Sequence, residues 1–244
     1  LSLLSGKIQI HTVSARETAL MRLPKASRSA SAKSKRQKKA FPSLPQISIH
    51  QLVFPHNEIS QELAGEKMVV ALNGSFQAVS LSSLKTTLAV ERTDQHGFKG
   101  NLKAHQDGKN LGILCNFSGP PDGLLQRLPY VQLHDELRLK LEGEGPFDAW
   151  KGRLTLYEGD TRVLDAGLHL NLPGKTVQFD TEGTLRPLEG LLTQSQRELT
   201  AGQKRARFNV QGIYHHEETE LEFRSAKLTM PAAEITSSGR FNFG

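Results

Sequence analysis

The chain has 244 residues, enough for one large domain or two ordinary ones. Hydrophobic residues make up 37% and charged residues 23%, a composition that excludes a wholly disordered chain. The longest apolar run, 68–72, is far shorter than the roughly 20 residues that a membrane-spanning helix needs. Cys115 is the only cysteine, which excludes an intramolecular disulfide and a cysteine-based metal site; we expect a small buried hydrophobic residue there.

The net charge of +6 arises from one segment. Seven cations lie within 25–39, and the rest of the chain is almost neutral, with 24 basic and 25 acidic residues. The segment is interleaved with serine and alanine and cannot bury enough apolar surface to offset its ordering entropy. We therefore predict a flexible basic loop at 25–45, between two strands.

This basic loop has three possible roles. A solvated loop is the simplest, and contact with anionic lipid headgroups is the second. Nucleic-acid binding is disfavoured, because no aromatic residues are interleaved for base stacking. The candidate headgroup contacts are Lys33, Lys35, Arg36, Lys38 and Lys39.

Alternating apolar and polar residues, the period of a strand with one buried face, run through the chain. Glycines at 107–108, 158–160 and 173–175 supply the positive φ of tight hairpin turns between the runs. Consecutive strands are therefore expected to be antiparallel neighbours in an all-β chain, with first strands in 1–24 and a continuous repetitive segment over 46–244. The expected strands lie at 7–11, 46–50, 67–76, 84–91, 97–103, 111–117, 136–142, 153–156, 167–172, 177–179, 207–211, 220–223 and 240–243.

Two short helical segments are expected at 120–125 and 187–192, the second continuing to about 201. Both read Pro-x-x-Gly-Leu-Leu and begin with proline at a helix-start position. Their recurrence after several strands is a weak internal repeat.

The dry face of such a sheet must be covered, either by a second sheet in a sandwich or by curling into a trough that holds an apolar ligand. Aromatic residues are only 6%, which slightly favours the trough, although sandwiches show the same alternation. In a trough, the apolar positions of the alternating runs would line a groove for lipid; in a sandwich, they would form the core. These positions are Leu137, Leu139, Leu141, Leu154, Leu156, Leu168, Leu170, Leu172, Phe179, Phe208, Val210, Leu221 and Phe223.

No pattern in the sequence predicts catalysis, so we expect no enzyme, no catalytic residue and no cofactor. The cluster at 215–218, His-His-Glu-Glu, is interpreted as a solvated hairpin tip, because adjacent strand residues point to opposite faces and cannot share a metal; in a turn, the alternative, they could share one. The carboxylate pairs at 135–136 and 142–144 stand beside cations on polar positions, which predicts cross-strand charge pairing. Four histidines occupy polar positions and are expected to point outward: His11, His50, His134 and His169.

Several segments resemble one known family. The opening runs 3–10, 20–24 and 42–49, and the middle runs 119–125, 139–146 and 150–156, are similar to the TamB family, the large AsmA-like proteins of the bacterial envelope. The resemblance extends from residue 3 to about residue 192. It rests on degenerate glycine and leucine patterns.

The resemblance implies a long antiparallel sheet curled into an apolar groove, a β-taco, that conducts phospholipid between the inner and outer membranes and supports outer-membrane protein assembly. It implies a location in the periplasm of a Gram-negative bacterium, with an inner-membrane helix upstream. Since the sequence opens at Leu1 without a leader, we expect a piece of a longer protein. The expected partners are phospholipid acyl chains, flanking strands of the same polypeptide and, through a part outside this chain, an outer-membrane barrel protein. The alternative is a β-sandwich adhesion or carbohydrate-binding module with a disordered basic loop.

Overall fold

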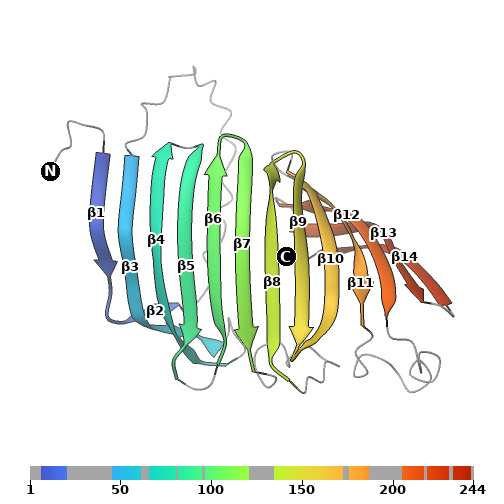
Figure 1. Ribbon diagram of the computed structural model, residues 1–244, viewed down its shortest axis with the longest axis horizontal. Helices are drawn as coiled ribbons and strands as arrows, with labels where there is room; N and C mark the ends of the chain where they lie inside the picture. The colour runs from blue at the N-terminus through green and yellow to red at the C-terminus, as the bar shows by residue number, and fades with distance from the viewer. Residues whose placement is uncertain are drawn as a thin grey trace.

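The computed structural model describes residues 7–20, 46–61, 66–80, 82–94, 97–120, 135–172, 176–186, 205–216, 219–230 and 233–242. These residues are almost entirely strand, in agreement with the alternation in the sequence (Figure 1). The strands are β1 (Lys7–Ser14), β2 (Thr18–Leu20), β3 (Gln46–Ile59), β4 (Met68–Ser80), β5 (Ser83–Arg92), β6 (Lys99–Asp107), β7 (Asn110–Gly119), β8 (Leu137–Pro146), β9 (Trp150–Glu158), β10 (Thr161–Asn171), β11 (Thr176–Leu185), β12 (Ala206–His215), β13 (Glu220–Met230) and β14 (Ala233–Asn242).

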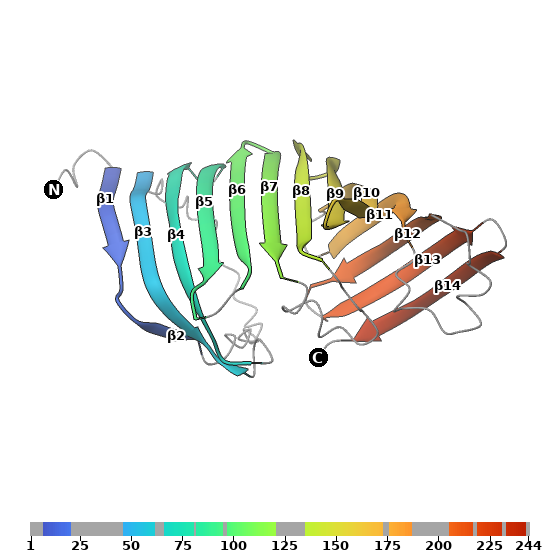
Figure 2. The same cartoon turned by 60° about the horizontal axis from the view of Figure 1, so that its bottom comes forward.

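All fourteen strands belong to one sheet, in the order β1-β3-β4 and then sequentially to β14. From β3 onward, each strand pairs antiparallel with the next one in the sequence. The sheet is long, curved and open, with the last strands strongly inclined to the first ones (Figures 1 and 2). The expected all-β elongated antiparallel sheet is confirmed, and the described residues form no second sheet that would close it into a sandwich.

The start of the chain departs from the expected hairpin pattern. Strand β1 pairs with β3 in parallel, with Ile8 opposite Ile47, and β2 pairs in parallel with the far end of β3, with Thr18 opposite Asn57. The expectation that consecutive strands are always antiparallel is wrong here. A parallel pair needs a long connection, and the segment between β2 and β3 supplies the length.

Two of the three predicted glycine turns are confirmed. Gly108 and Gly159 have φ of 59° and 55° and connect β6 to β7 and β9 to β10. The third turn, at 173–175, lies outside the described residues, as do the basic loop at 25–45, all but the first residue of the helical segment at 120–125, and the whole of that at 187–192. Among the described residues, no helix is long and apolar enough to cross a membrane.

The register aligns apolar residues into rows that cross the sheet. The longest apolar alignment, here called the central row, has one residue on each strand from β3 to β14, and we call the face that carries it the apolar face. The row consists of Leu52, Gly74, Leu88, Leu102, Cys115, Leu141, Leu154, Ala166, Gly183, Phe208, Leu228 and Ile235.

The buried residues lie mainly on this face. Trp150 and Met68 are 2% and 1% exposed, and Val70, Leu137, Ala166 and Ala206 are buried as well. Most other apolar side chains of the face, including the leucines of β8 and β9 after Leu137, are only half-buried. A closed sandwich core would bury them fully, so the arrangement is that of an open trough.

Candidate functional site

The thirteen residues predicted to line a groove lie on the apolar face. Leu139 lies opposite Phe117 and Leu156, one row beside the central row. Leu168 and Val210 lie in the next row on the other side, where each is opposite Thr181. The other predicted residues either belong to these rows or lie beside them on the same face, at every second position of their strands. Alternation predicts which residues of a single strand share a face. The register of the paired strands shows that these apolar faces are continuous from one strand to the next.

Aromatic rings cover glycines on the apolar face. The Trp150 ring lies over Gly143 and Gly152, where any Cβ would overlap it. The Phe179 ring covers Gly212 in the same way, and it meets the Phe223 ring edge-on with centroids 6.1 Å apart. Glycines of this kind let neighbouring strands bend sharply beneath a large ring, which favours the curvature of the sheet.

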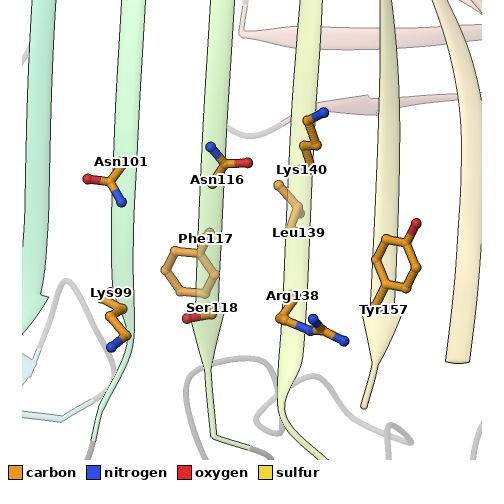
Figure 3. Close-up of a pocket in the computed structure, with 9 residues that line it drawn as sticks. All are labelled: Lys99, Asn101, Asn116, Phe117, Ser118, Arg138, Leu139, Lys140 and Tyr157. Atoms are coloured by element: carbon orange, nitrogen blue, oxygen red, sulfur yellow. The ribbon is translucent and has the colours of Figure 1, made fainter. Parts of the chain in front are cut away.

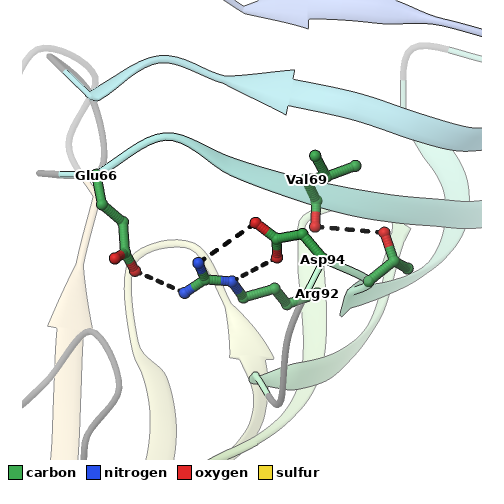
Figure 4. A network of polar contacts seen from close by, with 5 residues as sticks. Glu66, Val69, Arg92 and Asp94 are labelled. Atoms are coloured by element: carbon green, nitrogen blue, oxygen red, sulfur yellow. Dashed lines mark hydrogen bonds and ion pairs between the residues drawn. The ribbon is translucent and has the colours of Figure 1, made fainter.

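The apolar face ends at a charged cluster beside the start of β4 and the end of β5 (Figure 4). Arg92 lies opposite Val70 on the apolar face, and its side chain is only 5% exposed. Its Nη1 lies 2.6 Å from Glu66 Oε1, and its Nε donates to Asp94 Oδ1 at 2.7 Å. The hydrogen bond from Arg92 holds the pKa of Asp94 below its ordinary value, and the two carboxylates raise the pKa of Arg92 despite its burial.

The opposite face, here called the polar face, carries ion pairs. Asp165 accepts two hydrogen bonds from Arg153, both of 2.7 Å, and a third from Arg162 of 2.8 Å. These cations, Arg153 first, hold the pKa of Asp165 below its ordinary value. Such pairing organises the outer surface and offers no unpaired carboxylate for acid–base chemistry at this point.

The carboxylate pairs of the sequence behave in different ways. Glu142 pairs with Lys140 of its own strand at 2.6 Å and lies opposite Arg153. Glu144 reaches His105, two strands away, at 3.9 Å, because the imidazole lies over Gly112 of the strand between. For 142–144, the cross-strand neighbours are therefore Arg153, opposite Glu142, and His105, near Glu144, whereas the close ion pair of Glu142 is with Lys140 of its own strand. In the pair 135–136, the backbone carbonyl of Glu136 accepts a hydrogen bond from the Gly159 N–H at 2.8 Å.

Three of the four histidines that were expected to point outward lie within the described residues, and all three are exposed. His11 and His50 are exposed and stack with ring centroids 5.5 Å apart, and His169 is exposed on β10. His134 lies outside the described residues. Cys115, expected to be buried, is half-buried in the central row, because that row is not sealed by a second layer.

The hairpin between β12 and β13 forms a cluster that the sequence analysis missed. His215 faces Glu220 and Glu222 across the hairpin, with candidate ligand atoms of all three within 4.8 Å of one another. Arg240 lies 3.9 Å from Glu220 and 3.5 Å from Glu222, so the carboxylates already have a cationic neighbour. A His-Glu-Glu set is chemically able to bind Zn²⁺, but here it belongs to an ion-pair network. Counting register back from the turn would have found this cluster.

A shallow hollow of about 370 Å³ lies on the polar face across β6 to β9 (Figure 3). It is lined by two rows of polar side chains and by Phe117 and Leu139, which lie between the rows along their strands. The polar members are Lys99, Asn101, Asn116, Ser118, Arg138, Lys140 and Tyr157. The cations predicted for headgroup contact, at 33–39, lie outside the described residues.

No protein-family model, curated protein or solved structure matches the chain. The resemblance to TamB therefore rests on the segments quoted from the sequence.

Proposed function

We propose that this chain binds phospholipid acyl chains along its apolar face and conducts them, as a segment of a TamB-like periplasmic protein without enzymatic activity. The observation that carries the proposal is the central row, an apolar alignment that continues without a charged residue from Leu52 to Ile235 on an open sheet. An open apolar face of this extent needs an apolar partner.

The dimensions of the row suit acyl chains. Twelve strands spaced about 4.8 Å apart give a path of roughly 50 Å before curvature is considered. A lipid tail spans half of a hydrocarbon core of about 30 Å, so the face offers room for more than one tail. Each buried methylene contributes about 0.8 kcal/mol without directional preference. A ligand held in this way is able to slide, as a conduit requires.

The other parts of the proposal follow from the resemblance. Flanking strands of the same polypeptide would extend the sheet at both ends, and an inner-membrane helix and an outer-membrane barrel partner would lie at the two ends of the longer protein. Cations 33–39 would contact anionic headgroups near the membrane. The sandwich alternative is less well supported, since the apolar side chains are half-buried on a single sheet.

A charge-insertion experiment tests lipid binding. The chain is produced in a bacterial periplasm, purified without detergent and extracted with organic solvent, and phospholipid per protein is measured by mass spectrometry. We expect near-stoichiometric phospholipid in the wild type and a severalfold loss in Leu139→Asp and Leu170→Asp, because a carboxylate on the apolar face repels acyl chains. His169→Asp, on the polar face beside Leu170, is the matched control and should retain its lipid. A lipid-free wild type, or full loading of both leucine variants, would contradict the proposal.

Trp150 gives an independent measurement. It is the only tryptophan, and it lies on the apolar face opposite Leu170. A phospholipid brominated on its acyl chains should quench the fluorescence of Trp150, whereas soluble bromide should not, because the ring is 2% exposed. Equal quenching by both agents would place the ring at a wet surface and argue against a tail-binding face.

A further inference from the structure

The hollow on the polar face is formed by two parallel rows of side chains. Lys99, Ser118, Arg138 and Tyr157 form one row on β6 to β9, each opposite the next. Asn101, Asn116 and Lys140 form the second. Figure 3 shows the two asparagines side by side on neighbouring strands and Arg138 directed toward Tyr157. This surface lies on the far side of the sheet from the apolar face.

The centre of the hollow has unused hydrogen-bonding capacity. Within the part of the chain that the structure describes, no side-chain hydrogen bond or ion pair engages Lys99, Asn101, Asn116 or Ser118. Arg153 on the same face, by comparison, donates to Asp165. No carboxylate lines the hollow itself.

Arg138, Lys140 and Tyr157 line the β8 and β9 side of the hollow. Arg138 stacks over the Tyr157 ring with Cζ 5.7 Å from its centroid, and it pairs with Asp160 at 3.1 Å outside the hollow. Lys140 pairs with Glu142 at 2.6 Å, which positions its ammonium at the rim. The hollow thus has one cation at one end, Lys99, which lies opposite Glu91 in the register, and two cations at the other end, Arg138 and Lys140, each already paired with one carboxylate outside the hollow.

We propose that this hollow binds an acidic saccharide, a sugar chain of about two rings that carries carboxylate or phosphate groups. The asparagines decide between a sugar and a simple anion. Each amide offers a donor and an acceptor, and a sugar hydroxyl satisfies both, whereas a phosphate oxygen only accepts. Three interstrand steps of about 4.8 Å place Lys99 roughly 14 Å from Tyr157, too far for one small anion to reach both. A sugar ring would lie against the side of the hollow formed by Arg138 and Tyr157, and the cations at its ends would contact the acidic groups.

The binding experiment uses the full chain and four probes: digalacturonate, which is a disaccharide with two carboxylates; a phosphorylated monosaccharide; neutral maltose; and inorganic phosphate. Isothermal titration calorimetry should show saturable binding of digalacturonate in the millimolar range or below, with weaker binding of the phosphosugar and at least about tenfold weaker binding of maltose and phosphate. A phosphosugar that binds more tightly than digalacturonate would assign phosphate as the acidic group. Binding should weaken as salt is raised.

Variants locate the ligand. Lys99→Met and Asn116→Ala should each weaken digalacturonate binding about tenfold, and both residues are exposed, so thermal unfolding should be unchanged. Lys85→Met, which removes an exposed cation of the polar face outside the hollow, is the matched control and should bind like the wild type. An equal loss of digalacturonate affinity in Lys85→Met would show that binding depends on general surface charge and not on the hollow. Equal binding of maltose and digalacturonate, or no saturable binding, would also overturn the proposal. None of these outcomes depends on lipid, so this proposal and the groove stand or fall separately.

Discussion

The indole N–H of Trp150 in β9 donates to the backbone carbonyl of Leu111 in β7 at 2.9 Å, across the intervening strand β8. The ring crosses β8 above Gly143 and is in contact with Gly152 of its own strand. One side chain thus links three neighbouring strands, β7, β8 and β9, on the apolar face. Because Trp150 is 2% exposed, we expect this contact to set local stability.

Gly143→Ala and Gly152→Ala should each destabilise the fold by about 1–3 kcal/mol, since a new Cβ would overlap the Trp150 ring and force it away from Leu111. The free energy of unfolding is measured by urea denaturation. Gly167→Ala is the control, because its Cβ would meet only one atom, Glu182 O, at 3.8 Å. A loss in the control as large as in the two variants would show that strand propensity, and not the ring, is responsible.

The charged cluster around Arg92 should make the fold sensitive to acid. The folded state lowers the pKa of Asp94 from its ordinary value of 3.8, so the carboxylate adds stability above the unfolded pKa and loses it as pH falls through the folded value. Thermal unfolding should therefore show a steep loss of stability below about pH 4. Asp94→Asn should be less stable than the wild type at pH 7 and should lose less on acidification. Asp148→Asn, at an exposed carboxylate outside the cluster, is the control, and a wild-type pH profile in Asp94→Asn would contradict the assignment.

Alternation along each strand predicted which residues share a face, and for that reason the thirteen apolar positions could be chosen from the sequence. A period of two depends only on backbone geometry, so it survives whatever the strand pairs with. The sequence did not decide between sandwich and trough, because both require the same alternation. The parallel pairing of β1 with β3 was missed, because the direction of a strand after a long connection leaves no local pattern.

Contacts that depend on register were also beyond the sequence. The Arg92 guanidinium pairs with Glu66, which lies 26 residues earlier in the chain. His215 pairs with Glu222 across a hairpin. The hollow on the polar face is formed by residues of four strands, so Lys99 and Lys140 lie on one surface only when these strands are correctly aligned. Turn glycines such as Gly108 and Gly159 fixed the hairpin ends, so register could have been extended from them for β6 to β7 and β9 to β10.

Asp165 holds two arginines of the polar face together, and Asp165→Asn should lower thermal stability at low salt. Without the carboxylate, Arg153 and Arg162 repel each other, since each lies within 2.8 Å of that group in the wild type. The difference from the wild type should shrink near 1 M salt, where the screening length falls to about 3 Å. Melting temperatures across a salt series provide the measurement. A difference that does not change with salt would indicate a loss of hydrogen bonds or packing in place of charge pairing.

The outer edge of β14 should drive self-association of the isolated chain. Ile235 and Phe241 are 52% and 56% exposed and continue the apolar face to a strand with no neighbour on its far side among the described residues. An exposed apolar edge strand is a template for pairing with another chain. The double variant Ile235→Lys with Phe241→Lys should reduce the concentration-dependent growth in mass seen by light scattering. Ser238→Lys is the control, because it adds charge to the same strand without removing apolar surface; an equal reduction in this variant would assign the effect to net charge. A wild type that stays monomeric at all concentrations would contradict self-association through β14.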